Sequence, residues 1–339
     1  MRHEHVTFEL PAMRAAPPQE LQRWRRQFVE LSEDVVRELG HAPPQMTHDD
    51  DMPLSMELAV ADVAFEVIHA PGPRQDEVLI ACVVEPPRVG RAVGMWTALL
   101  AANLELIREH RSIGADPDSD AILHVARLQL TALNAPSLHA MTREMAELAK
   151  GWSAGDFAVP QRSPTTRSRD GSIEAITHRA VFASLIDDVE RLTASEATVL
   201  PGNRLSTDLT VEITLHEFAF KLSHGHCSDS AVFTVECCFG PVPNEQAQDV
   251  LLRMLHINRA LADVSTGAAF AIEPATGAAV FAKLHSLNVP DASALLDAMT
   301  WMTTQARQWR STFFLDADDD DDLEPSGLLD SSWCIATNE

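Results

Sequence analysis

Two short stretches of this sequence bring together side chains that could bind a metal ion. His224, His226 and Cys227 lie within "HGHC", and His48 begins the acidic run "HDDD". Zinc takes imidazole, thiolate and carboxylate ligands, but it needs three or four of them in a closed geometry. Neither stretch has an evident fourth ligand, and His69, which matches His224 in an internal repeat, lacks such neighbours. We interpret both stretches as polar loops and expect neither a metal nor another cofactor.

Catalytic and phosphate-binding motifs are not found in the sequence. It contains no GxxxxGK[ST] or GxGxxG loop, no GxSxG elbow and no HExxH helix. A carboxylate acting as general acid or base needs a pKa tuned by burial, whereas Glu57 and Glu212 fall on the outward phase of predicted strands, a pattern typical of a solvated face. With no convergent polar set, we predict that the protein is not an enzyme and has no catalytic residues.

Composition and charge narrow the classes of partner. The 339 residues are enough for two domains. A formal net charge of −24 repels nucleic-acid phosphates and anionic lipids. No apolar run approaches about 18 residues, and the N-terminal "MRHEHVTFEL" lacks the apolar core of a secretory signal. We expect a cytoplasmic protein with no nucleic-acid or membrane partner, and buried free thiols for its five cysteines.

Hydrophobic periodicity in the first half predicts helices and short strands. A phase break stands out, because apolar alternation from Met56 to Val60 resumes on the other phase from Val63 to Val67. Two strands joined by a tight turn at "AD" would produce this break. In order, the predicted elements are a helix over 18–40, the two strands, a strand over 77–85, a helix over about 91–110, a strand or strands that include 120–131 and a helix over 137–152.

The second half repeats the first at an offset of 155 residues. The window 57–106 gives ten identities, among them Glu57 with Glu212 and Asn103 with Asn258, where average composition supplies roughly three. We predict a duplicated domain. The expected boundaries are a first domain over 1–152, a linker over 153–172, a second domain over 173–315 and a disordered acidic tail over 316–339.

The matched asparagines lie in otherwise apolar helices, within "MWTALLAANLEL" and "VLLRMLHINRAL". An interior asparagine can set register or pairing at an interface. Simple exposure of both side chains is the alternative, and the sequence leaves the two open.

The repeated order α-β-β-β-α-β-β-α resembles the CesT/Tir-chaperone family, the class I chaperones of bacterial type III secretion. "PPRVGRAVGMWTALLAANLEL" and "GPVPNEQAQDVLLRMLHINRAL" are similar to its signature helix. "LNAPSLHAMTREMAELAKGW" and "LNVPDASALLDAMTWMTTQARQW" are similar to its closing helix. The resemblance covers about residues 20–152 and 173–313. Members of the family are usually single-domain homodimers, whereas this chain carries two copies.

The resemblance implies an α+β fold with two tandem copies, each a twisted antiparallel sheet flanked by helices, and the two copies paired as a pseudo-dimer. It implies a cytoplasmic bacterial chaperone that binds the extended N-terminal region of a secreted effector and keeps it competent for secretion, with the secretion ATPase as a further partner. The alternative is a regulatory or scaffold protein of the secretion system that binds a folded partner with the same fold.

The resemblance also suggests two sets of site residues. Effector contacts are expected on the first helix and the sheet face of each copy, with packing as core the alternative for each side chain: Leu58, Val60, Phe65, Val67, Val211, Ile213, Phe220 and Leu222. The middle helices are expected to form a pseudo-dimer interface, within one chain or between the two chains of a homodimer: Trp96, Leu99, Leu100, Asn103, Leu251, Met254, Leu255 and Asn258.

Overall fold

The structure is a computed structural model, and it describes most of both repeated halves. The described residues are 18–38, 52–70, 75–85, 93–159, 173–193, 197–200, 209–225, 227, 229–264, 267–288 and 291–315. The "HDDD" stretch, His226, most of the expected linker and the acidic tail lie outside them. None of the helices in this part of the chain is long and apolar enough to span a bilayer.

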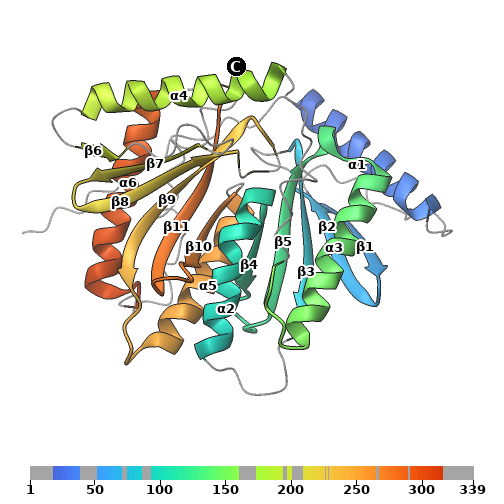
Figure 1. The fold of residues 1–339 in the computed structure, drawn as a ribbon. Coiled ribbons are helices and arrows are strands. Elements are labelled where there is room, and N and C mark those ends of the chain that lie inside the picture. Colours follow the sequence, from blue (N-terminus) through green and yellow to red (C-terminus); the bar gives the residue numbers. More distant parts are fainter. Residues whose placement is uncertain are drawn as a thin grey trace, which may run out of the picture.

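The first half forms an antiparallel sheet with helices packed on it, which we call the first unit (Figure 1). Its strand order is β1-β2-β3-β5-β4. Its elements are α1 (Pro18–Glu38), β1 (Leu54–Val60), β2 (Val63–His69), β3 (Glu77–Val84), α2 (Val93–Leu106), the 3-10 turn η1 (Ile107–Glu109), β4 (Arg111–Ala115), β5 (Ile122–Gln129), the 3-10 turn η2 (Leu130–Ala132) and α3 (Ala135–Ser153).

The second half, the second unit, repeats this arrangement and adds one strand. Its antiparallel sheet has the order β10-β11-β9-β8-β7-β6. The elements are α4 (Ile173–Thr193), β6 (Ala197–Leu200), β7 (Leu209–Leu215), β8 (Phe218–His224), β9 (Val232–Pro241), α5 (Ala247–Val264), β10 (Ala268–Ile272), β11 (Ala278–Ser286) and α6 (Ala292–Thr312). The predicted α+β class with two tandem units is confirmed.

The phase break seen in the sequence is a two-residue hairpin turn in both units. Ala61 and Asp62 have φ of 50° and 63°, and the matched His216 and Glu217 have φ of 48° and 71°. Two consecutive left-handed residues define the turn that suits the twist of a two-residue hairpin. The turn fixes the register of β1 on β2 and of β7 on β8, so the apolar side chains of each hairpin share the core face.

A histidine ties the first helix of each unit to its sheet. His69 stacks on Phe28 of α1 at 5.5 Å between ring centroids, and His224 stacks on Phe182 of α4 at 5.4 Å. The Nε2 atom of His69 lies 2.6 Å from the Gln75 carbonyl oxygen. His224 of "HGHC" therefore has a packing role in the second unit that His69 repeats in the first. Within the described residues no group of three metal-ligating side chains comes together.

Two strands were not resolved by the sequence pattern. The predicted helix over about 91–110 ends at Leu106, and β4 follows after η1. β4 has five buried residues and so shows no polar alternation. β6 has only four residues, too few for a period to be visible.

Candidate functional site

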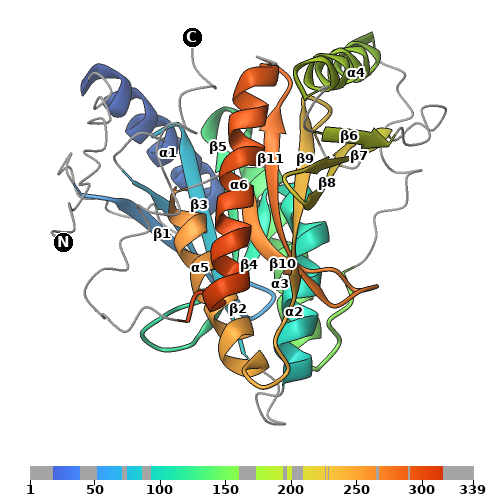
Figure 2. The same cartoon turned by 90° about the vertical axis from the view of Figure 1, so that its left-hand side faces the viewer.

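The two units meet through their middle helices, and each helix covers the last strand of the other unit's sheet. α2 packs against β10, α5 packs against β4, and the two helices also contact each other (Figures 1 and 2). β4 and β10 are edge strands. Because a buried edge strand still carries backbone groups that need hydrogen-bond partners, this interface must supply them.

Asn103 and Asn258 supply those partners. The Oδ1 atom of Asn103 accepts from the Ile113 N–H at 2.7 Å, and that of Asn258 accepts from the Phe270 N–H at 2.6 Å. Each Nδ2 group donates to both the Ile113 and the Phe270 carbonyl oxygens, at 2.9–3.3 Å. Both side chains are fully buried. The asparagine pair therefore satisfies the outward backbone groups of Ile113 in β4 and of Phe270 in β10 at once.

The other expected interface residues surround this pair in the core. All of them are buried: Trp96, Leu99, Leu100, Leu251, Met254 and Leu255. α2 is apolar on nearly every side because it lies between its own unit and β10 of the other. The structure thus brings the two sets of interface residues together within one chain and places neither asparagine at the surface.

Gly114 of β4 allows α5 to approach closely. A Cβ atom at Gly114 would lie 2.6 Å from the backbone nitrogen and 2.8 Å from the Cα atom of Arg259. Since backbone atoms cannot yield as a flexible side chain does, we expect Gly114→Ala to lower the free energy of unfolding by about 1–3 kcal/mol, measured by urea denaturation. Gly94→Ala in α2 is the control, because no heavy atom lies within 4 Å of its Cβ position. A Gly114 variant no less stable than the Gly94 variant would contradict this close packing.

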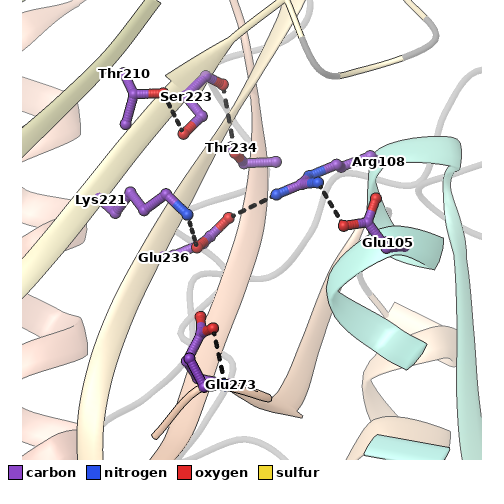
Figure 3. A network of polar contacts seen from close by, with 9 residues as sticks. Glu105, Arg108, Thr210, Lys221, Ser223, Thr234, Glu236 and Glu273 are labelled. Carbon is purple, nitrogen blue, oxygen red and sulfur yellow. Dashed lines mark hydrogen bonds and ion pairs between the residues drawn. The ribbon is translucent and has the colours of Figure 1, made fainter. Parts of the chain in front are cut away.

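Charged contacts reinforce the interface on the outer face of the second sheet (Figure 3). Arg108 of η1 donates to Glu105 at 2.9 Å and to Glu236 of β9 at 3.4 Å. Lys221 of β8 lies 3.5 Å from the other oxygen of Glu236. At the matched position of the first unit stands Ala81. The outer faces of the two sheets therefore differ in chemistry although their folds match.

A matching contact on the first sheet uses backbone acceptors instead. Arg127 of β5 donates from Nε to the Ala262 carbonyl and from Nη2 to the Asp263 carbonyl, both at 2.9 Å. These carbonyls belong to the last turn of α5, where a helix leaves its acceptors unsatisfied and favours a cation. An arginine therefore fixes the end of each middle helix to the other unit. Arg127 of the first unit binds the end of α5, and Arg108, which follows α2, binds Glu236 of the second unit.

The expected effector contacts lie in the core. Leu58 is half-buried, and the other residues of this set are at most 7% exposed: Val60, Phe65, Val67, Val211, Ile213, Phe220 and Leu222. These side chains therefore form no open apolar surface, because the helices already cover them. Their burial favours the alternative of core packing, and a role in binding an effector stays a prediction for them.

The outer edge of β1 presents backbone groups that no strand of the described residues pairs with. Val60 and Val63 close the two-residue turn, so alternation directs the N–H and C=O groups of Ser55, Glu57 and Ala59 away from β2. We call these three residues the first-unit edge. Their side chains are exposed, and no strand lies beside β1 on this side in the described part of the chain. Such an edge is a template for another extended segment.

The equivalent edge in the second unit is covered. Thr210, Glu212 and Thr214 of β7 form the second-unit edge by the same alternation, and β6 lies antiparallel against it. The register pairs Thr198 with Thr214 and Leu200 with Glu212. The two units are therefore alike in fold but different at the edge where a further strand could add.

Comparisons with known proteins bear on the second unit. Residues 226–310 match the Tir chaperone protein (CesT) family. No curated protein matches the sequence. Similar solved structures include the HopA1–SchA chaperone–effector complex (19% identity, 38% of this chain and 94% of that chain covered, TM-score 0.31). The ExsC–ExsE complex is also similar (15%, 38% and 92%, TM-score 0.32), as is the ExoT–SpcS complex from Pseudomonas aeruginosa (17%, 37% and 97%, TM-score 0.28).

With TM-scores this low, the structural likenesses support no conclusion by themselves. The sequence match runs from just before β9 into α6 and so includes α5 with Asn258. The resemblance inferred from the order of the elements and from the helix sequences is confirmed there, because residues 226–310 match the model of the Tir chaperone protein (CesT) family.

Proposed function

We propose that the protein is a type III secretion chaperone that holds an extended segment of a secreted effector as an added strand on the first-unit edge. The observation that carries this proposal is the edge of β1, which no strand of the described residues covers, on a sheet whose opposite edge is closed by α5. The family match in the second unit supports the same class of function.

Strand addition explains how such a chaperone would bind without a preformed pocket. Main-chain hydrogen bonds to Ser55, Glu57 and Ala59 would supply affinity, and alternate side chains of the effector would supply specificity. Half-buried Leu58 lies on the core face of the same strand, so an apolar effector side chain would shield it. The exposed side of the edge is lined by small or acidic side chains that leave room for an incoming strand.

Charge favours an effector segment that is neutral or basic. The net charge of −24 keeps the free protein from self-association. It also raises the association rate of a cationic segment and makes that rate fall with added salt. On the basis of the family resemblance, we also propose that the bound segment is the N-terminal region of the effector and that the chaperone delivers it to an unfolding ATPase.

Pull-down after co-expression discriminates the chaperone from a scaffold that binds a folded partner. We expect the full chain to retain an effector segment of about 50–100 residues that is disordered by itself, the behaviour of a segment that folds on binding. Retention of a folded domain alone would favour the regulatory or scaffold alternative.

Glu57→Pro is expected to weaken retention of the effector segment at least about tenfold, which corresponds to about 1.4 kcal/mol. Proline removes an N–H that points away from β2, so the β1–β2 pairing is kept while the edge loses a donor. Glu57→Gln keeps the N–H and is expected to retain the segment. Affinity measured by fluorescence anisotropy, with circular dichroism as a check of folding, tests this. Equal binding by both variants would contradict strand addition at β1.

A further inference from the structure

The second unit carries a strand that has no counterpart among the described residues of the first. β6 begins four residues after α4 ends at Thr193, and it lies along β7 at the border of the sheet (Figures 1 and 2). The second sheet therefore has six strands where the first has five. Because the rest of the two hairpins is matched residue by residue, β6 is the main difference between the two edges.

β6 occupies the place that an added strand would take on β1. The offset of 155 that relates β1 to β7 also relates residues 42–45 to β6. Residues 42–45 read Ala-Pro-Pro-Gln and lie outside the described part of the chain. Proline has no N–H to donate to a ladder, so this sequence is poorly suited to the pairing that Ala197–Leu200 makes.

One core-face side chain is also more buried in β7 than at the matched position of β1. Ile213 of β7 is 1% exposed, and Val199 of β6 is its register partner. The matched Leu58 of β1 is only half-buried. At this matched position the core-face side chain is thus covered in the unit that has the extra strand and only partly covered in the unit that lacks it.

From these differences we infer that residues 197–200 are a built-in occupant of the second-unit edge. They take the place of an effector strand there and leave one strand-binding edge per chain, on β1. The inference that each chain binds one effector segment rests on the proposed function. The closure of the second-unit edge by β6 does not rest on it.

Tethering makes this occupant hard to displace. Three residues join β6 to α4 and eight join it to β7. Short connections give a tethered segment an effective concentration on the order of millimolar at its site. A strand of equal intrinsic affinity supplied at micromolar concentration would therefore bind at β1, where no described strand competes, in preference to β7.

Amide hydrogen exchange of the full-length chain, resolved by residue, tests the closure without any effector. We expect the amides of Glu212 and Thr214 to exchange at least about tenfold more slowly than those of Glu57 and Ala59, their repeat partners, because exchange requires opening of the hydrogen bond. Equal rates in the two pairs would overturn the inference.

Two proline variants separate loss of the β6–β7 pairing from a general effect of proline. The alternation that directs Thr214 outward makes Thr198 a hydrogen-bonded partner of β7 and turns the N–H of Val199 away from it. We expect Thr198→Pro to raise exchange at Glu212 and Thr214 to the rates of Glu57 and Ala59, and Val199→Pro to leave them slow. The inference fails if both variants, or neither, raise these rates while the fold is retained.

A peptide with the sequence of residues 194–203 serves as the probe for strand binding. The wild-type chain is expected to bind one peptide, with new protection at Ser55, Glu57 and Ala59, and the Thr198→Pro variant is expected to bind two. Two peptides on the wild type would overturn the built-in occupant. A further outcome is that the peptide protects the amides of β7 in the Thr198→Pro variant but those of β1 in neither protein. This result would contradict the proposed function, but it would still support residues 197–200 as the occupant of the second-unit edge.

Discussion

Replacing Asn103 by leucine is expected to lower the free energy of unfolding by about 3 kcal/mol. The Ile113 N–H would lose its acceptor, and the Ile113 and Phe270 carbonyls would each lose a donor, at a site with no access to water. Each unsatisfied buried group costs about 1–3 kcal/mol. Urea denaturation of the full chain measures the loss, and Leu99→Met in the same helix is the control, since a volume-conserving change of a buried side chain costs less than about 1.5 kcal/mol.

Because the two asparagines are related by pseudo-symmetry, the effects of the Asn258 variant and of the double variant can also be predicted. Asn258→Leu should cost about as much as Asn103→Leu, because the two amides share both carbonyls. Groups in one hydrogen-bond network are coupled, so the double variant should deviate from the sum of the single losses by about 0.5–3 kcal/mol. Additive effects would show that the two asparagines act in separate places and would contradict a shared interface.

Acid is expected to destabilise the protein through buried histidines. Burial lowers the pKa of His124 well below its ordinary value, and the nearby Arg111 adds to this; burial also lowers the pKa of His69. Below about pH 6.5 the unfolded chain therefore binds protons that the folded chain does not, and stability that is present above this pH is lost as the pH falls. His124 and His69 act in the same direction.

His124→Leu isolates the titration from the loss of packing. This variant should show a smaller drop in unfolding free energy between pH 7 and pH 5, measured by urea denaturation at each pH. Trp152→Phe is the matched control, because the Trp152 ring lies 5.0 Å from that of His124 but does not titrate. It should be less stable at both pH values and keep the wild-type drop. An unchanged drop in the His124 variant would show that His124 does not carry the effect.

The sequence predicted the elements whose pattern is local. The turn at Ala61 and Asp62 was visible because it reverses the alternation of the strands around it, and its copy at His216 and Glu217 repeated the signal. A role for Asn103 and Asn258 at an interface could be predicted because a polar residue recurs at the same offset in two apolar helices. What the sequence could not show was their partners, since the backbone of Phe270 lies 167 residues from Asn103.

The site was predicted less well than the fold for a physical reason. Alternation shows that Val60, Phe65 and Val67 share a face, but it does not show whether a helix covers that face, and in the structure helices do. The open edge of β1 depends on main-chain groups, which every residue carries, so no residue type marks it. β6 is too short to show a period, and only the matched positions of the two units reveal the difference between their edges.

Site-specific photo-crosslinking in cells that produce the protein tests whether an effector strand adds at the edge of β1 and not at that of β7. The crosslinker replaces Glu57 on the open edge or Glu212, the same residue type at the matched position of the covered edge. We predict that Glu57 yields adducts with the N-terminal segment of a secreted protein, identified by mass spectrometry, and that Glu212 yields adducts with residues 197–200 of its own chain. Intermolecular adducts of equal yield at both positions, or adducts at Glu57 only with the surface of a folded protein, would contradict a secretion chaperone with one open edge.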